Sequence, residues 1–201
     1  ILEESMKRTG IMGGTFDPIH MGHIEMARKA QSEFTLDSII FVPSGNSYMK
    51  QNVTDARKRY EMVELAVLQY GFEISDIESR SNKPSFTFET LQNFHLIYPK
   101  DEFYFILGED SLNSIEKWRK PELIFNQANI IVAGRKEQCG SESLRECIQR
   151  ISAKYDVVIE EMFFENRISS TQIRKSFESN DPLYDAIPSS VCRYIKENQI
   201  Y

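Results

Sequence analysis

The residues best suited to chemistry lie in one stretch near the start of the chain, GGTFDPIHMGH at 13–23. His20 and His23 are three residues apart, a spacing that puts both rings on one face of a helix. Imidazoles can donate hydrogen bonds to phosphate oxygens, and a helix N-terminus itself favours an anion. Gly13 and Gly14 let the backbone turn sharply and approach a ligand closely. The stretch therefore predicts a phosphate-binding site.

Two plainer interpretations of this stretch stay open. Gly13 and Gly14 would serve as a tight turn alone, and a histidine pair at this spacing would form half of a metal site. The metal interpretation lacks a nearby Cys or His partner, and two of the three histidines of the chain fall in this one predicted helix start. We therefore expect phosphate binding and no metal ion held by protein side chains.

A second candidate anion site lies far along the chain, in ISSTQIR at 168–174. Ser169 and Gln172 have the spacing of a capping box, which would simply start a helix. The hydroxyl and backbone N–H groups of Ser169 and Ser170, and the guanidinium of Arg174, would equally suit phosphate oxygens. The two interpretations are compatible.

Further candidates follow predicted strands. Gly108 ends a strand, where a backbone can pass close to a ligand, and Asp110 could accept hydrogen bonds from ribose hydroxyls. Trp118 offers a flat face to an aromatic ring, with core packing as its default role. Arg135 ends another strand and is either a phosphate ligand or an exposed surface cation.

Strands and helices are predicted to alternate, which indicates an α/β fold with a doubly wound, mostly parallel sheet and helices on both faces. In such folds ligands bind beyond the carboxyl ends of the strands, where the motifs above fall. The predicted strands are 9–12, 38–43, 72–77, 102–107, 129–133 and 156–160. The predicted helices are 21–34, 55–69 with Thr54 as cap, 87–98, 111–125 with a break near Pro121, 141–153, 170–179 and 188–198.

The length, the net charge and the cysteine content of the chain narrow the class of protein. The chain has 201 residues and a net charge of −6, from 24 Lys and Arg against 30 Asp and Glu. An acidic chain of this length is typical of one globular domain and argues against a general nucleic-acid partner. Its uncharged runs are too short for a membrane span and its start does not resemble a signal peptide. Three cysteines without a CxxC pair favour a reduced, cytoplasmic protein.

Both motifs resemble those of a known group of enzymes. GGTFDPIHMGH is similar to the signature of the nucleotidyltransferase superfamily that carries an (H/T)xGH motif, and ISSTQIR is similar to its second signature. The first motif most resembles that of the bacterial nicotinate-nucleotide adenylyltransferases. The resemblance runs from Thr9 to Tyr201 and implies a Rossmann-like fold and a single nucleotidyltransferase domain over 6–201. Residues 1–5 would be an extension, or residues added before a start at Met6.

The resemblance implies transfer of AMP from ATP to nicotinate mononucleotide, giving deamido-NAD and pyrophosphate in NAD biosynthesis. His20, His23 and Arg174 would be the catalytic residues. ATP would be bound by these three and by further residues of the same motifs, namely Gly13, Gly14, Thr15, Phe16, Gly108, Asp110, Ile168, Ser169 and Ser170. Mg²⁺ would arrive with ATP rather than in a protein cage.

Three segments resemble the acceptor side of the family. FVPSGN at 41–46 and the following Lys50 imply that Asn46 and Lys50 face the mononucleotide. PSFTFETL at 84–91 is similar to PSYTxDTL and implies that Thr87 contacts the pyridine carboxyl group. PSFTFETL departs from that pattern at Phe86 and Glu89. The segment before Lys50 departs from the family's corresponding FxPxxN…K element. GEDSL at 108–112 with the following Trp118 is similar to GxDxL…W. Trp118 and Arg135 would complete the acceptor site.

Alternatives remain at this point. The same transfer could use nicotinamide mononucleotide, phosphopantetheine or another phosphorylated acceptor. A class I aminoacyl-tRNA synthetase fragment would explain HMGH, but the acidic charge, the short chain and the lack of a KMSKS-like segment argue against it. A non-catalytic nucleotide sensor would be expected to have lost a histidine or Arg174. The sequence leaves the oligomeric state open, a homo-oligomer included.

Overall fold

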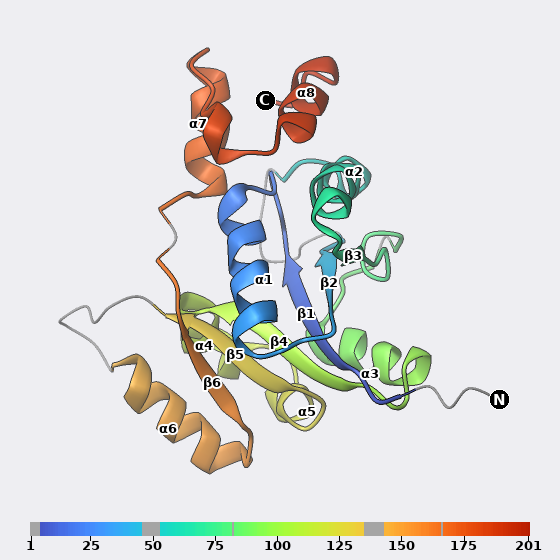
Figure 1. The fold of residues 1–201 in the computed structure, drawn as a ribbon, viewed down its shortest axis with the longest axis vertical. Coiled ribbons are helices and arrows are strands. Elements are labelled where there is room, and N and C mark those ends of the chain that lie inside the picture. The colour runs from blue at the N-terminus through green and yellow to red at the C-terminus, as the bar shows by residue number, and fades with distance from the viewer. Residues whose placement is uncertain (1–4, 46–52, 82, 135–142, 166) are drawn as a thin grey trace. The chain divides into compact units, whose positions relative to one another are not determined.

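The computed structural model describes residues 5–45, 53–81, 83–134, 143–165 and 167–201. Asn46, Lys50 and Arg135 lie outside the described residues. The strands are β1 (Arg8–Gly14), β2 (Ser38–Pro43), β3 (Glu73–Ile74), β4 (Glu102–Gly108), β5 (Asn129–Gly134) and β6 (Ile159–Phe163) (Figure 1). The helices are α1 (Met21–Glu33), α2 (Ala56–Val67), α3 (Thr87–Ile97), α4 (Glu109–Ser114), α5 (Pro121–Phe125), α6 (Leu144–Tyr155), α7 (Ser170–Glu178) and α8 (Ser189–Glu197). Short 3₁₀ turns cover Leu68–Tyr70, Ile115–Lys117 and Tyr184–Ala186.

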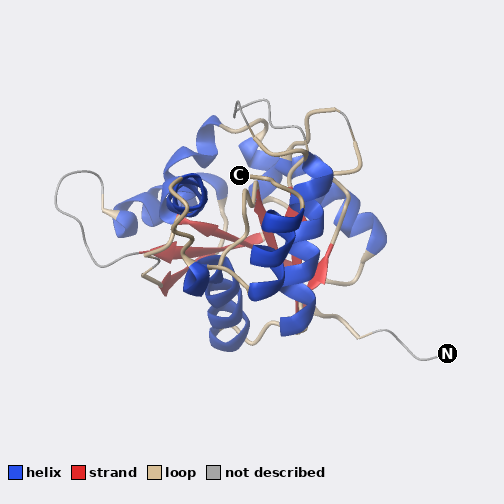
Figure 2. Ribbon diagram, turned by 90° about the horizontal axis from the view of Figure 1, so that it is seen from above, coloured by secondary structure: helices blue, strands red, loops and turns tan. Residues whose placement is uncertain are grey.

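The strands form one sheet in the order β3-β2-β1-β4-β5-β6. Thr9 pairs with Phe103, Tyr104 with Asn129 and Ile130 with Ile159, all in parallel register. The order reverses between β1 and β4, which is the arrangement of a Rossmann-like sheet. The predicted α/β, doubly wound class is confirmed, since at least one helix separates each strand from the next along the chain. Figure 2 shows the strands in red and the helices in blue.

The central strands are buried along almost their whole length. Ile39–Val42, Phe103–Leu107 and Ile130–Val132 are apolar and at most 6% exposed. Parallel strands covered on both faces have this continuous apolar character, and so these strands were predicted at nearly their observed bounds. In the described part of the chain no helix is both long and apolar enough to cross a membrane.

Several predicted boundaries differ from the structure, and the helix predicted at 111–125 consists of α4, a 3₁₀ turn and α5. Asp55, not Thr54, caps α2, because the Asp55 carboxylate accepts hydrogen bonds from the backbone N–H groups of Arg57 and Lys58. β3 contains two residues instead of six. β6 starts at Ile159 instead of 156, because α6 continues to Tyr155 and ends at Asp156 in the left-handed conformation (φ +50°), which turns the chain before a strand can begin.

The chain forms two compact units, which we describe separately. The sheet unit contains residues 1–12, 29–39 and 86–165. The motif unit contains residues 13–28, 40–85 and 166–201. Both predicted phosphate motifs fall in the motif unit, and the Thr87, Gly108 and Trp118 segments fall in the sheet unit.

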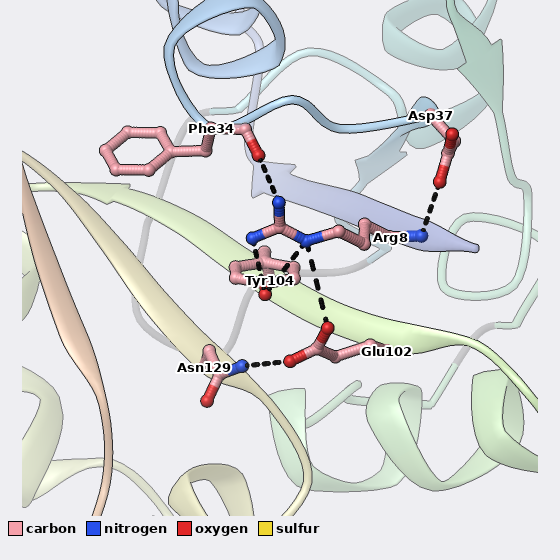
Figure 3. Close-up of polar contacts among 6 residues, drawn as sticks. All are labelled: Arg8, Phe34, Asp37, Glu102, Tyr104 and Asn129. Atoms are coloured by element: carbon pink, nitrogen blue, oxygen red, sulfur yellow. Dashed lines mark hydrogen bonds and ion pairs between the residues drawn. The ribbon is translucent and has the colours of Figure 1, made fainter. Parts of the chain in front are cut away.

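In the sheet unit, Arg8 ties together the amino-terminal starts of three strands (Figure 3). Its guanidinium donates hydrogen bonds to the Phe34 carbonyl (2.8 Å) and to the Tyr104 hydroxyl (2.7 Å), and it pairs with Glu102 at 3.8 Å. Glu102 in turn accepts a hydrogen bond from Asn129 (2.9 Å). Ligands of this fold class bind at the opposite, carboxyl ends of the strands, so we assign this cluster to stability.

Candidate active site

The first motif forms a tight loop between β1 and α1. A Cβ atom on Gly14 would lie 2.8 Å from the Phe16 ring, so the ring folds over a strand end that has room for glycine alone. Phe16 itself has φ +48°, a left-handed conformation that is uncommon outside glycine. Backbone strain of this kind concentrates at functional sites.

The two histidines of this loop stack on one another. Their ring centroids are 3.7 Å apart with an interplanar angle of 24°. The His23 Nδ1 atom accepts a hydrogen bond from the backbone N–H of His20 (3.2 Å), so neutral His23 carries its proton on Nε2. The Phe16 ring supports His23 edge-on, with centroids 5.0 Å apart. The prediction that both imidazoles share one face is confirmed.

His20 is buried and neutral. Its residue is 2% exposed, and this burial lowers the pKa of its imidazole to about 4. Its Nδ1 atom is buried and has no hydrogen-bond partner among the described residues. A buried polar atom without a partner is costly in a native structure and is typical of a site that acts on a ligand. His20 would therefore meet a phosphate as a neutral imidazole.

The second motif starts α7 with the predicted capping box. The Ser169 hydroxyl accepts from the Gln172 backbone N–H (3.2 Å), and the Gln172 side chain accepts from the Ser169 N–H (3.0 Å). The capping interpretation is thus confirmed, and it leaves the phosphate interpretation of the same helix start intact.

The start of α7 is bonded to the loop of the first motif. The Ser170 hydroxyl donates to the Pro18 carbonyl (2.9 Å), and the Arg174 guanidinium donates to the Asp17 carbonyl (2.6 Å). A further donor of Arg174 reaches the Thr171 hydroxyl at 3.2 Å. The structure therefore brings the two motifs together within the motif unit. Ser170 and Arg174 have partners in the protein that the sequence analysis did not anticipate.

Three residues of this site were not predicted from the sequence, namely Asp17, Arg59 and Tyr201. Asp17 is 6% exposed and its carboxylate accepts from the Thr54 backbone N–H (3.2 Å) and from the Tyr201 hydroxyl (2.5 Å). Arg59 is 1% exposed and bonds to the same loop through the Thr15 carbonyl. A signal for Arg59 existed, because it lies three, four and seven positions before Met62, Val63 and Ala66, on the buried face of α2.

In the sheet unit, the Thr87 and Trp118 segments approach one another. Thr87 is the first residue of α3, whose cap position, Phe86, makes no side-chain capping bond. The Arg119 guanidinium lies over the Phe86 ring, 4.6 Å from its centroid. The residue after Trp118 therefore packs on the residue before Thr87. Thr87 is thus the first residue of a helix without being its cap.

Gly108, Asp110 and Trp118 follow one another at the end of β4. A Cβ atom on Gly108 would meet no atom within 4 Å, so the backbone there borders open space. Asp110 is exposed on α4. Trp118 is half-buried, and its ring makes an edge contact with Phe105 at a centroid distance of 6.3 Å. Trp118 therefore packs on the sheet and still presents part of its ring.

Within the described ranges, no three His, Cys, Asp or Glu side chains lie close enough to hold a metal ion. The imidazoles of His20 and His23 and the guanidinium of Arg174 are hydrogen-bond donors, which suits phosphate oxygens.

Comparison with known proteins shows the family. The family model described as cytidylyltransferase-like matches residues 11–176. A Desulfitobacterium hafniense protein named "Probable nicotinate-nucleotide adenylyltransferase" is 38% identical over 202 residues, covering 97% of this chain and 96% of its own. A Clostridium botulinum protein of the same name is 39% identical, covering 98% of each.

Solved structures show the same fold. A Plasmodium falciparum nicotinic acid mononucleotide adenylyltransferase complexed with NaAD has a TM-score of 0.77 at 22% identity, over 97% of each chain. The same enzyme complexed with APC has a TM-score of 0.75 at 20% identity. With this fold, the two joined motifs and the family match, the chain belongs to the cytidylyltransferase-like family of nucleotidyltransferases. Its curated relatives carry the nicotinate-nucleotide adenylyltransferase name over nearly their full length.

Proposed function

We propose that this chain transfers AMP from ATP to nicotinate mononucleotide, forming deamido-NAD and pyrophosphate in NAD biosynthesis. The observation that carries the proposal is the bonding of two phosphate-type helix starts into one site, through Ser170 and Arg174 on the loop at Asp17 and Pro18. The names of the full-length relatives support the choice of substrates.

The proposed reaction is an in-line displacement. A 5′-phosphate oxygen of the acceptor attacks the α-phosphorus of ATP, a P–O bond forms, and the bond to pyrophosphate breaks. The attacking oxygen is already anionic, so the step needs no general base. Catalysis then rests on positioning and on donors aimed at charge that grows on the phosphates.

The motif unit would supply those donors. His20 and His23 would each offer a ring N–H to the triphosphate, from rings fixed by stacking. The start of α7 would offer backbone N–H groups near Ser169 and Ser170, and Arg174 would add a positive charge beside them. The backbone of Gly13–Phe16 and Ile168 would line the same nucleotide.

On the acceptor side, Trp118 would stack on the pyridine ring, and the start of α3 at Thr87 would bind the ring carboxylate. Gly108 and Asp110 would bind ATP, with Asp110 accepting hydrogen bonds from ribose hydroxyls or from groups beside the adenine. The roles of Asn46, Lys50 and Arg135 are proposed from sequence alone, because they fall outside the described residues.

Mg²⁺ would reach the site on the ATP phosphates, where it neutralises charge on the leaving pyrophosphate. Mg²⁺ commonly keeps several waters and takes few protein ligands, which fits the donor-rich character of the described site residues. We also propose that residues 6–201 act as one nucleotidyltransferase domain. Cys147 and Cys192 are buried as thiols, which supports a reducing, cytoplasmic location.

The experiment is pyrophosphate release with Mg²⁺-ATP, with nicotinate mononucleotide and nicotinamide mononucleotide compared at equal concentration. We expect a strong preference for the acid. Equal rates would keep adenylyl transfer and remove the acid-specific assignment. No release with either acceptor would overturn the proposal and leave phosphopantetheine and other phosphorylated acceptors to be tried.

A further inference from the structure

Arg59 is a buried arginine that the proposed reaction does not use. It lies near the start of α2 and is 1% exposed, among the largest fully buried side chains of the described residues. Its neighbours on the same helix face are Met62, Val63 and Ala66, all apolar and fully buried. Arginine is seldom buried to this extent unless its donors are satisfied, so its contacts indicate its role.

The Arg59 guanidinium joins three segments of the motif unit. Nε donates to the Thr54 carbonyl (2.8 Å), Nη1 to the Thr15 carbonyl (2.7 Å) and Nη2 to the Gly45 carbonyl (2.8 Å). A weaker bond runs from Nη1 to the Ser44 hydroxyl (3.3 Å). Thr15 follows β1, Ser44 and Gly45 follow β2, and Thr54 precedes α2. One planar fork thus fixes the loops at the carboxyl ends of two strands.

The hydrogen-bond partners of this fork within the described residues are neutral. They are three carbonyls and one hydroxyl, and burial lowers the pKa of Arg59 although the charges of Asp17 and Asp55 oppose this. Arginine nevertheless stays protonated in proteins. A buried guanidinium that bonds to carbonyls of three backbone segments can hold those segments in one geometry, which explains why an arginine lies here.

The geometry extends from Arg59 to the stacked histidines. Thr54 accepts from Arg59 and donates its backbone N–H to Asp17, so Arg59 and Thr54 hold both ends of the loop from Thr15 to Asp17. Between these ends lies Phe16, in its left-handed conformation. The Phe16 ring rests against His23 at 5.0 Å.

We propose that Arg59 is a positioning residue for the candidate active site, acting through the Thr15–Asp17 loop and Phe16 to orient His23. This inference rests on the proposed function for its kinetic consequences only. Loss of the fork would let Phe16 leave its left-handed conformation and would release the His23 ring. Displacement of a catalytic group by about 1 Å can cost on the order of 100-fold in rate.

The test compares Arg59→Lys and Arg59→Met with Arg57→Met. Arg57 is the matched control, because it lies on the same helix with its side chain 87% exposed and paired to Glu61. Lysine keeps the charge but cannot reach three carbonyls with one ammonium group. We expect both Arg59 variants to lower kcat by roughly 10-fold to 100-fold per folded molecule, with KM for ATP changed less than about 3-fold. Arg57→Met should leave both constants unchanged.

A second measurement does not depend on activity. The imidazole ¹⁵N shifts of ligand-free wild-type protein should show His23 protonated on Nε2, and the Arg59 variants should show a mixture of tautomers. Restoration of kcat by Arg59→Lys, or an unchanged His23 tautomer in both variants, would overturn the proposal. If Arg59→Met does not fold, Arg59→Lys carries both measurements. If the wild-type enzyme releases no pyrophosphate, the proposed function fails and the tautomer measurement still decides the role of Arg59.

Discussion

The Tyr201 hydroxyl donates a hydrogen bond of 2.5 Å to the Asp17 carboxylate, across 184 positions of sequence. Burial, together with this bond to Asp17, raises the pKa of the Tyr201 phenol well above its ordinary value. Tyr201 is therefore a donor at neutral pH. The bond fixes the other end of the loop from the one that Arg59 holds, since Arg59 bonds to Thr15 and Tyr201 to Asp17.

Replacing Tyr201 by phenylalanine should lower the free energy of unfolding by about 1–3 kcal/mol, because one oxygen of the buried Asp17 carboxylate loses its donor. Urea unfolding at pH 7 would measure the change. Tyr184→Phe is the control, since Tyr184 is 55% exposed and its hydroxyl meets an exposed lysine. An equal change in the free energy of unfolding for the two substitutions would show that the Tyr201 bond stabilises the protein no more than an exposed hydroxyl contact does.

His20→Ala and His23→Ala should each reduce turnover by about 100-fold or more, as expected when one preorganised donor to a growing charge is lost. Initial rates of pyrophosphate release would measure this, with the fold checked by circular dichroism. His95→Ala serves as the control, because His95 bonds to the Gln127 carbonyl and packs on Phe103 in the sheet unit. Turnover within 3-fold of wild type for both substitutions in the first motif would remove these histidines from the catalytic site.

The stability of the protein should fall in mild acid because of His20. Its pKa is about 4 when folded and 6.5 when unfolded, so between these values the unfolded chain binds a proton that the folded chain excludes. The free energy of unfolding should therefore decrease as the pH falls from 6.5 to 4, by up to about 3 kcal/mol. The difference between wild type and His20→Gln, measured by urea unfolding across this range, isolates that contribution. A pH-independent difference would contradict a buried neutral His20.

Glu116 should show a dependence of the same sign at lower pH. Hydrogen bonds from Lys154 and then Arg150 lower the pKa of its carboxyl to about 2. The stabilisation is therefore complete above the ordinary value of 4.5 and is lost as the pH falls toward 2. Because the partners are largely exposed, we expect Glu116→Gln to cost only about 0.2–1 kcal/mol at pH 7.

Thermal unfolding at pH 7 and at pH 3 would measure this cost, which should shrink at the lower pH. Glu160→Gln, at an exposed position of β6 in the same unit, provides the comparison. A cost of Glu116→Gln that stayed constant to pH 2.5 would show that the ion pairs do not hold the carboxylate ionised.

Much of the fold could be predicted from local sequence patterns. β2 was predicted at its observed bounds, because SIIFVP is a run of β-branched and aromatic residues that a buried parallel strand requires. The start of α1 at Met21 and of α7 at Ser170 followed from the spacing of their motifs. The cap of α2 was misplaced by one residue, since both Thr54 and Asp55 are good caps and only the backbone conformation decides between them.

The candidate site was less accessible from sequence. The shared face of His20 and His23 was predicted, because they are three residues apart, whereas the stacking of their rings was not. Arg59 and Tyr201 were missed as site residues, since their partners are loop carbonyls and a carboxylate far away in sequence. The bond from Arg174 to the Asp17 carbonyl depends on how the chain folds back and has no local signature.

The bonds from Ser170 to Pro18 and from Arg174 to Asp17 also bear on how the site is made during synthesis. They span 152 and 157 positions, so the first motif leaves the ribosome long before the residues that complete it. Domains fold as their segments emerge, and a nascent chain that stops before 170 would carry the full GGTFDPIHMGH motif without its second anion-binding helix. Nucleotide binding should thus appear late in translation, and abandoned chains should not compete with finished molecules for ATP.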